Sequence, residues 1–129
     1  FFADYLRSNY FGDDAGTYNV SIPGTGIFAG LSGFSFDNGS GGSLTGERVT
    51  YNVAYPDQMT PVNGSAGNLN YSGGSGGTAG IEYTGTYKLV YLGFPFETIT
   101  STSAQNDVMN RVLTFFAVST KIDDWSLYQ

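Results

Sequence analysis

One stretch constrains the fold more than any other, because an apolar strand there leads directly into a well-marked helix. Residues 89–92 read Leu-Val-Tyr-Leu, an unbroken apolar run that is typical of a strand buried on both faces. Gly93 and Pro95 end this strand, and a helical pattern follows over 103–116. The pattern predicts a strand over Tyr87–Leu92 in the middle of a sheet, with the helix packed on it.

The helical pattern over 103–116 is the strongest in the chain. Thr102 or Ser103 can cap its N-terminus, and Asp107 lies in the first turn, where an acidic side chain is favourable. Its apolar side chains fall on one face: Val108, Met109, Val112, Leu113, Phe115 and Phe116. This stripe predicts core packing rather than a cofactor site.

The remaining chain consists of short strands and Gly-rich loops. A short helix is expected within 1–10 and a connecting loop over 57–64, while 26–36 fits either a bent strand or a packed loop. Strands are expected at 17–22, 48–55, 67–71 and 79–84. The last of these forms a predicted hairpin with the Tyr87 strand through Gly85-Thr86.

Length and charge narrow the class of protein. A chain of 129 residues predicts one domain, over 1–118, followed by an extended tail over 119–129. The 11 acidic and 5 basic residues give a net charge of -6, which argues against nucleic acid and anionic membrane surfaces as partners. The 19 Gly, 10 Tyr and 10 Phe resemble a secreted or cell-surface β-rich protein.

The sequence contains neither Cys nor His, which limits the chemistry available to it. Thiol nucleophiles, a Ser-His-Asp triad and Cys/His zinc sites are thereby excluded, and no cofactor or metal is expected. Asp13–Gly16 lacks the ligand spacing of a calcium loop. A carboxylate-only mechanism, such as glycoside hydrolysis, survives and would pair Glu97 with Glu82 or Asp57.

The motif Gly93-Phe-Pro-Phe-Glu97, with the strand before it and the helix after it, resembles the C-terminal half of class I glutamine amidotransferase-like domains of secreted bacterial proteins. That family's fold is flavodoxin-like, so the resemblance implies an α/β fold with a partial flavodoxin-like sheet. The family carries His-Pro-Glu at this turn. Matching the two motifs keeps Glu97 as the family Glu and puts Pro95 where the His should be.

The resemblance therefore implies an inactive relative. The family's nucleophile elbow and its Cys belong to the N-terminal half of the domain, which this chain does not contain. Without the imidazole, Glu97 has no base to orient, so a structural role at the strand end is expected for it. An isolated half sheet also implies that further polypeptide, or another subunit, packs against this chain.

The segment Asp124–Gln129 is similar to the lead-in to the sorting domain of type IX secretion substrates. This similarity implies a secreted protein from which a sorting domain is removed near Gln129.

Together these observations predict a non-catalytic structural or interaction module of a secreted or cell-surface bacterial protein. Its expected partners are other protein chains, the missing half of the domain, or further copies of itself. A carbohydrate-binding module remains open, with Trp125 and Tyr71 as the aromatic side chains that stack on a cell-surface glycan. The carboxylate-only hydrolase is the third hypothesis.

Overall fold

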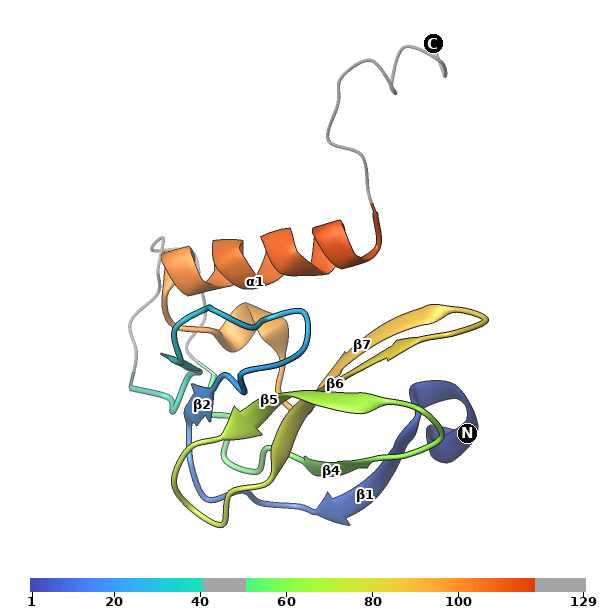
Figure 1. The fold of residues 1–129 in the computed structure, drawn as a ribbon. Coiled ribbons are helices and arrows are strands. Elements are labelled where there is room, and N and C mark those ends of the chain that lie inside the picture. The colour runs from blue at the N-terminus through green and yellow to red at the C-terminus, as the bar shows by residue number, and fades with distance from the viewer. Residues whose placement is uncertain (41–50, 118–129) are drawn as a thin grey trace, which may run out of the picture.

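The computed structural model describes residues 1–40 and 51–117, and its main element is a seven-stranded sheet (Figure 1). The strands follow the order β1-β4-β6-β5-β2-β3, and β7 pairs with β6 beside that path. Their bounds are β1 Ser8–Gly12, β2 Asn19–Ser21, β3 Phe34–Ser35, β4 Gln58–Pro61, β5 Ala66–Tyr71, β6 Thr78–Thr84 and β7 Lys88–Leu92. All of these pairings are antiparallel.

The fold is thus dominated by a sheet and carries one α-helix near its C-terminal end, which agrees with the predicted β-rich α/β class at that level. The antiparallel pairings differ from the parallel sheet of flavodoxin-like domains, so that finer prediction is not confirmed.

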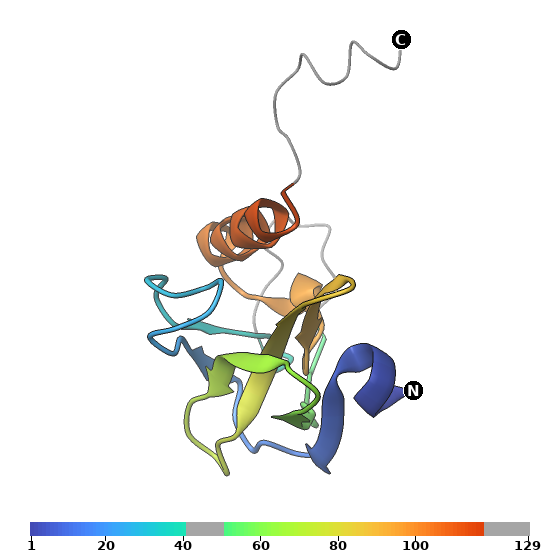
Figure 2. The ribbon, with the colours of Figure 1, turned by 45° about the vertical axis from the view of Figure 1, so that its right-hand side comes forward.

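Three helical segments accompany the sheet: η1 (Phe2–Leu6), η2 (Phe96–Thr98) and α1 (Thr102–Phe115). α1 confirms the predicted C-terminal helix. Its cap is Ser101, whose Oγ accepts a hydrogen bond from the Ala104 N–H at 3.2 Å, rather than Thr102 or Ser103. Figures 1 and 2 both place α1 at one end of the molecule and η1 with β1 at the other. Neither α1 nor any other helix in the described part of the chain is long and apolar enough to cross a membrane.

β7 lies at the side of the sheet, so the prediction of a central strand at this position was wrong. Among the described residues it pairs with β6 alone, from Gly80↔Leu92 to Thr84↔Lys88. Its side chains are half-buried rather than buried, apart from the exposed Lys88. Val90 and Leu92 pack against the core, whereas the other face of the strand is only partly covered. Half-burial on both faces explains why the run is apolar without being central.

The core is built mainly from aromatic side chains. The rings of Phe36 and Phe94 are stacked, with centroids 4.8 Å apart and an interplanar angle of 7°. Val108 of α1 is buried in the same cluster. Met109 and Phe116 are 38% and 40% exposed, so the apolar stripe of α1 is narrower than predicted.

Several local predictions also differ from the structure. The predicted loop over 57–64 contains β4, and the predicted N-terminal helix gives way to β1 after Leu6. Of the predicted strand over 48–55, the described part forms a single bridge, between Asn52 and Asn38. The β6–β7 turn has three residues rather than two, because Thr84 pairs with Lys88. The predicted tail over 119–129 lies outside the described residues.

Candidate functional site

Glu97 lies in η2 and is exposed. Its backbone carbonyl accepts a hydrogen bond from Gln105 Nε2 at 3.2 Å, and its carboxylate has no hydrogen-bond partner among the described residues. The N-terminus of α1 is capped by Ser101 instead. The N-terminus of α1 is therefore held by the Ser101 side chain and by the backbone of Glu97. The Glu97 carboxylate, which was expected to hold it, does not contribute.

Tyr71 is a core residue, which corrects its predicted role in stacking on sugars. The side chain is 4% exposed, and its hydroxyl donates a hydrogen bond of 2.7 Å to the carbonyl of Asp57. Burial raises the pKa of this hydroxyl, and the charge of Asp57 raises it further. A ring enclosed in the core offers no face to a ligand. Trp125, the other predicted stacking residue, lies outside the described residues.

The Gly93–Glu97 motif supports the fold around Asp57. The Asp57 N–H donates to the Gly93 carbonyl at 3.0 Å, and a Cβ at position 93 would collide with the Asp57 carbonyl and with the Tyr71 hydroxyl. Only glycine allows this close approach. Pro95 precedes η2, where its carbonyl accepts from Thr98 N at 3.0 Å.

Glu82, a predicted partner of Glu97 or Asp57, is engaged elsewhere. Its Oε2 accepts hydrogen bonds from the backbone N–H of Ile27 at 2.8 Å and from Asn68 Nδ2 at 3.2 Å. The carboxylate thereby ties the turn around Ile27 to the sheet. Within 1–40 and 51–117, no group of three or more acidic residues is placed to hold a metal ion.

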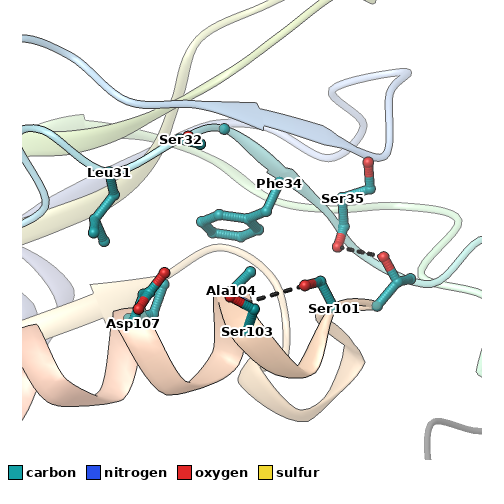
Figure 3. A pocket seen from close by; sticks show the side chains of 11 residues that line it. Leu31, Ser32, Phe34, Ser35, Ser101, Ser103, Ala104 and Asp107 are labelled. Atoms are coloured by element: carbon teal, nitrogen blue, oxygen red, sulfur yellow. Dashed lines mark hydrogen bonds between the residues drawn. The ribbon is translucent and has the colours of Figure 1, made fainter.

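One cleft, of about 370 Å³, lies between the chain before and along β3 and the first turns of α1 (Figure 3). The Phe34 ring points from β3 toward Ala104 of the helix. Hydroxyl groups dominate the polar lining, which comprises Ser32, Ser35, Thr100, Ser101, Ser103 and Asp107.

Two hydroxyls of this cleft hold its walls in place. Ser101 caps α1, and Thr100 Oγ1 donates to the Ser35 carbonyl at 3.1 Å. Among the described residues, no hydrogen bond joins one of these hydroxyls to Asp107, the acidic side chain of the lining. The cleft therefore offers hydroxyl groups and one carboxylate for hydrogen bonding.

A different surface is formed at the opposite end of the molecule by aromatic side chains of η1, β1 and Phe1, which we call the aromatic edge. Their exposed fractions lie between 58% and 76%, and the residues are Phe1, Phe2, Tyr5, Tyr10 and Phe11. The Phe1 ring contacts those of Phe2 and Tyr5, with centroids 5.9 Å and 5.5 Å apart. Contiguous exposed aromatic groups of this kind mark binding surfaces.

β1 carries two of these side chains and has an irregularity in its pairing. It is the first strand in the sheet order and pairs with β4, with a register shift between Tyr10 and Gly12 that leaves Phe11 as an extra residue. Both faces of β1 are open to solvent after Ser8. Tyr10 and Phe11 are both 68% exposed, although they are neighbours in the sequence.

η1 is held against the sheet by a network around Arg7. The Arg7 Nε donates to the Tyr87 hydroxyl at 2.9 Å, and the guanidinium lies 4.3 Å from the centroid of the Tyr83 ring. The Tyr87 hydroxyl in turn lies 2.6 Å from the Tyr5 carbonyl, to which it can donate. Asn63 Nδ2 donates to the Ala3 carbonyl at 2.8 Å. These contacts hold η1 against the β6–β7 hairpin.

A pocket of about 300 Å³ opens beside the aromatic edge, and we call it the edge pocket. Phe2, Tyr10 and Tyr91 line it from η1, β1 and β7, together with the buried Met59 of β4. Asp57, which precedes β4, also lines it.

The carboxylate of Asp57 is not neutralised by the described residues. It accepts no hydrogen bond and forms no ion pair there. Burial raises its pKa, and the negative charge of Asp13 raises it further. Burial, followed by the charge of Asp57, also raises the pKa of Tyr91, which lines the same pocket.

Sequence reasoning did not identify the aromatic edge as a site. It interpreted the aromatic residues of 1–10 as one face of a helix and did not predict β1. A usable signal was present in Tyr10-Phe11, because two consecutive aromatic residues cannot both face a core from a regular strand.

Comparisons of the chain with protein-family models, curated proteins and solved structures gave no match. Function is therefore inferred from the geometry of the aromatic edge and its pocket.

Proposed function

We propose that this chain is a non-catalytic interaction module that binds an extended segment of another polypeptide along β1. The observation that carries the proposal is the aromatic edge, where five exposed aromatic side chains adjoin an edge strand of the sheet. Their removal from water on binding is strongly favourable, because aromatic side chains contribute large areas to interfaces.

The backbone of β1 supports strand addition. The Val62 N–H donates to the Arg7 carbonyl at 3.1 Å. Because hydrogen-bonding residues alternate in an antiparallel pair, the backbone groups of Asn9 face β4, and those of Ser8 and Tyr10 face away from it. An extended segment can pair with these outward groups while its side chains contact the aromatic edge.

Sedimentation velocity over a concentration series tests this function. A free strand edge with exposed aromatic groups pairs with a second copy when no other partner is present. We therefore expect reversible self-association of the 129-residue chain. Tyr10→Asp and Phe11→Asp should each shift the equilibrium toward monomer by at least about tenfold, because a charge is then buried at the interface.

Tyr51→Asp is the matched control, because Tyr51 is 58% exposed and lies beside Asp37, after β3 at the other end of the strand order. It should associate like the wild type. A wild-type chain that stays monomeric at the highest attainable concentration would count against the proposal. Equal dissociation by the Tyr51 variant would assign the association to another surface.

On the sequence resemblance alone, we also propose that the module derives from an amidotransferase-like domain of a secreted, cell-surface bacterial protein exported by type IX secretion. A flavodoxin-like domain completed by further polypeptide would place a parallel strand beside β7. A structure of the chain together with its encoded flanking sequence tests this ancestry. A β7 without a parallel neighbour in that structure would contradict it.

Carbohydrate binding is the second candidate, favoured by tyrosines outside the aromatic edge. Tyr51 and Tyr55 are 58% and 71% exposed and can stack on sugar rings. Polysaccharide pull-down with the wild type, Tyr55→Ala and Trp125→Ala tests this candidate. Binding that both variants retain, or no binding by the wild type, would exclude these side chains as a glycan site.

A further inference from the structure

We propose that the edge pocket binds a lysine or arginine side chain of the docked polypeptide, so that the partner of this module is an extended basic segment. This inference rests on the proposed function, because it assigns the chemistry of the segment that pairs with β1. It is drawn from the walls of the pocket, from the charge inside it, and from the positions of the cations of the chain itself.

The walls of the edge pocket suit a long cationic side chain. Phe2, Tyr10 and Tyr91 contribute aromatic rings, and Met59, which is 5% exposed, adds an apolar wall. Aromatic faces attract ammonium and guanidinium groups, and the methylene stem of lysine or arginine packs well against apolar surface. The volume of about 300 Å³ is large enough for one such side chain.

Asp57 supplies the opposite charge at a fixed position. Its N–H donates to the Gly93 carbonyl at 3.0 Å, and its carbonyl accepts from the Tyr71 hydroxyl at 2.7 Å, so the backbone is held on both sides. Asp57 is exposed and lines the pocket, so an incoming cation can reach it; partial burial and the charge of Asp13 raise its pKa, and no hydrogen bond to its carboxylate offsets them among the described residues. A cation from outside would relieve this unfavourable arrangement.

The described cations of the chain are engaged away from the pocket. Arg7 donates to Tyr87 and to the carbonyl of Asn63. Lys88 Nζ donates to the Phe115 carbonyl, and the Arg111 guanidinium to two carbonyls near Ile27. In the part of the chain that the structure describes, none of these groups forms an ion pair with Asp57. Among the described residues, Asp57 is thus left open to a cation supplied by the partner.

Strand addition brings a side chain of the partner to this position. The edge pocket is lined by Asn9 and Tyr10 of β1 and lies directly beside the free edge of that strand. Side chains of an added strand alternate between the two faces of the sheet, so every second one lies on the face that carries the pocket. The net charge of -6 favours the approach of a basic segment.

Two synthetic peptides separate this inference from the proposed function. Both alternate Thr and Val, and they differ only at a central position that is Lys in one and Met in the other. Binding to the 129-residue chain is followed by nuclear magnetic resonance titration of the β1 amides. We expect the Lys peptide to bind about tenfold more tightly than the Met peptide, and the difference to shrink at high salt.

Asp57→Asn should reduce the preference for lysine to about twofold, chiefly by weakening the binding of the Lys peptide. Asp107→Asn, which removes one acidic charge from α1, is the matched control and should keep the preference. Equal binding of the two peptides at β1 would overturn the cation inference and leave the proposed function standing. Binding of neither peptide would overturn both. An unchanged preference in Asp57→Asn would remove Asp57 from the site.

Discussion

Two aromatic regions of this molecule use the same residue types in opposite ways. In the core beneath α1, Phe36 is 1% exposed and stacks on Phe94. In the aromatic edge, Tyr10 and Phe11 are each 68% exposed. The core rings come from segments far apart in the chain, whereas the edge rings all come from the first 12 residues.

The comparison shows what decides whether an aromatic side chain is buried. The backbone of Phe36 is held on both sides, because its N–H donates to the carbonyl of Tyr18, just before β2, and it forms a bridge with Ile99, just after η2. Tyr10 and Phe11 of the aromatic edge lie on β1, which pairs with β4 alone among the described residues, and the other three rings lie in or just before η1. Exposure is thus set by the position of the element in the fold rather than by residue type.

The largest expected difference in stability between the two regions comes from removing one aromatic ring from each of them. Phe36→Ala should lower the free energy of unfolding by about 3–5 kcal/mol, because it leaves a cavity in the core. Tyr10→Ala should change it by less than about 0.5 kcal/mol, as expected at an exposed position. Chemical denaturation of both variants measures the contrast. Similar losses would mean that the aromatic edge is part of the folding core.

A second pair contrasts two carboxylates. Glu82→Ala should lower the free energy of unfolding by about 1–3 kcal/mol, because it leaves the Ile27 N–H and the Asn68 amide without their acceptor. Glu97→Ala should cost less than about 0.5 kcal/mol, since Glu97 is exposed and its hydrogen bond to Gln105 uses the backbone. Thermal unfolding of the two variants measures this contrast. A larger loss of stability for Glu97→Ala than for Glu82→Ala would mean that the Glu97 carboxylate has a structural role.

The smallest expected change in the free energy of unfolding concerns Asp57. Its replacement should stabilise the chain, whereas the substitutions above destabilise it. The pKa of Asp57 is raised in the folded state, mainly by burial, so its ionisation opposes folding. Stability that is present below the pKa of the unfolded state is therefore lost as the pH rises through the higher pKa of the folded state. At neutral pH, Asp57→Asn should stabilise the chain by no more than about 0.5 kcal/mol.

This gain should disappear as the pH falls and Asp57 becomes protonated, because the neutral acid and the amide then carry the same charge. Melting temperatures of the wild type and Asp57→Asn across acid and neutral pH provide the measurement. A gain that stays constant with pH would point to a cause other than the charge.

The sequence predicted the elements whose patterns are local. α1 was predictable from its apolar stripe, and β5 and β6 from short segments in which apolar residues alternate with polar residues or glycine. β4 was not, because Gln58-Met-Thr-Pro61 has no strand pattern of its own and is ordered by pairing with β1 and β6. The position of β7 also depended on pairings that the sequence does not encode locally.

The candidate site was predictable only in its chemistry. The acidic charge and the surplus of aromatic residues were evident, and they indicated an interaction module. Tyr71 and Tyr10 are both tyrosines on strands, yet one is in the core and the other at the edge. Only the order of the strands separates them.

The extra residue at Phe11 has a consequence for how long an assembly on this edge can grow. A regular edge strand can template an indefinite stack of further strands, which is the geometry of fibrils. The bulge interrupts the outward row of backbone groups after Tyr10 and bends the strand. In the proposed strand addition only a short segment can pair with β1, so the bulge limits how far an assembly on this edge extends.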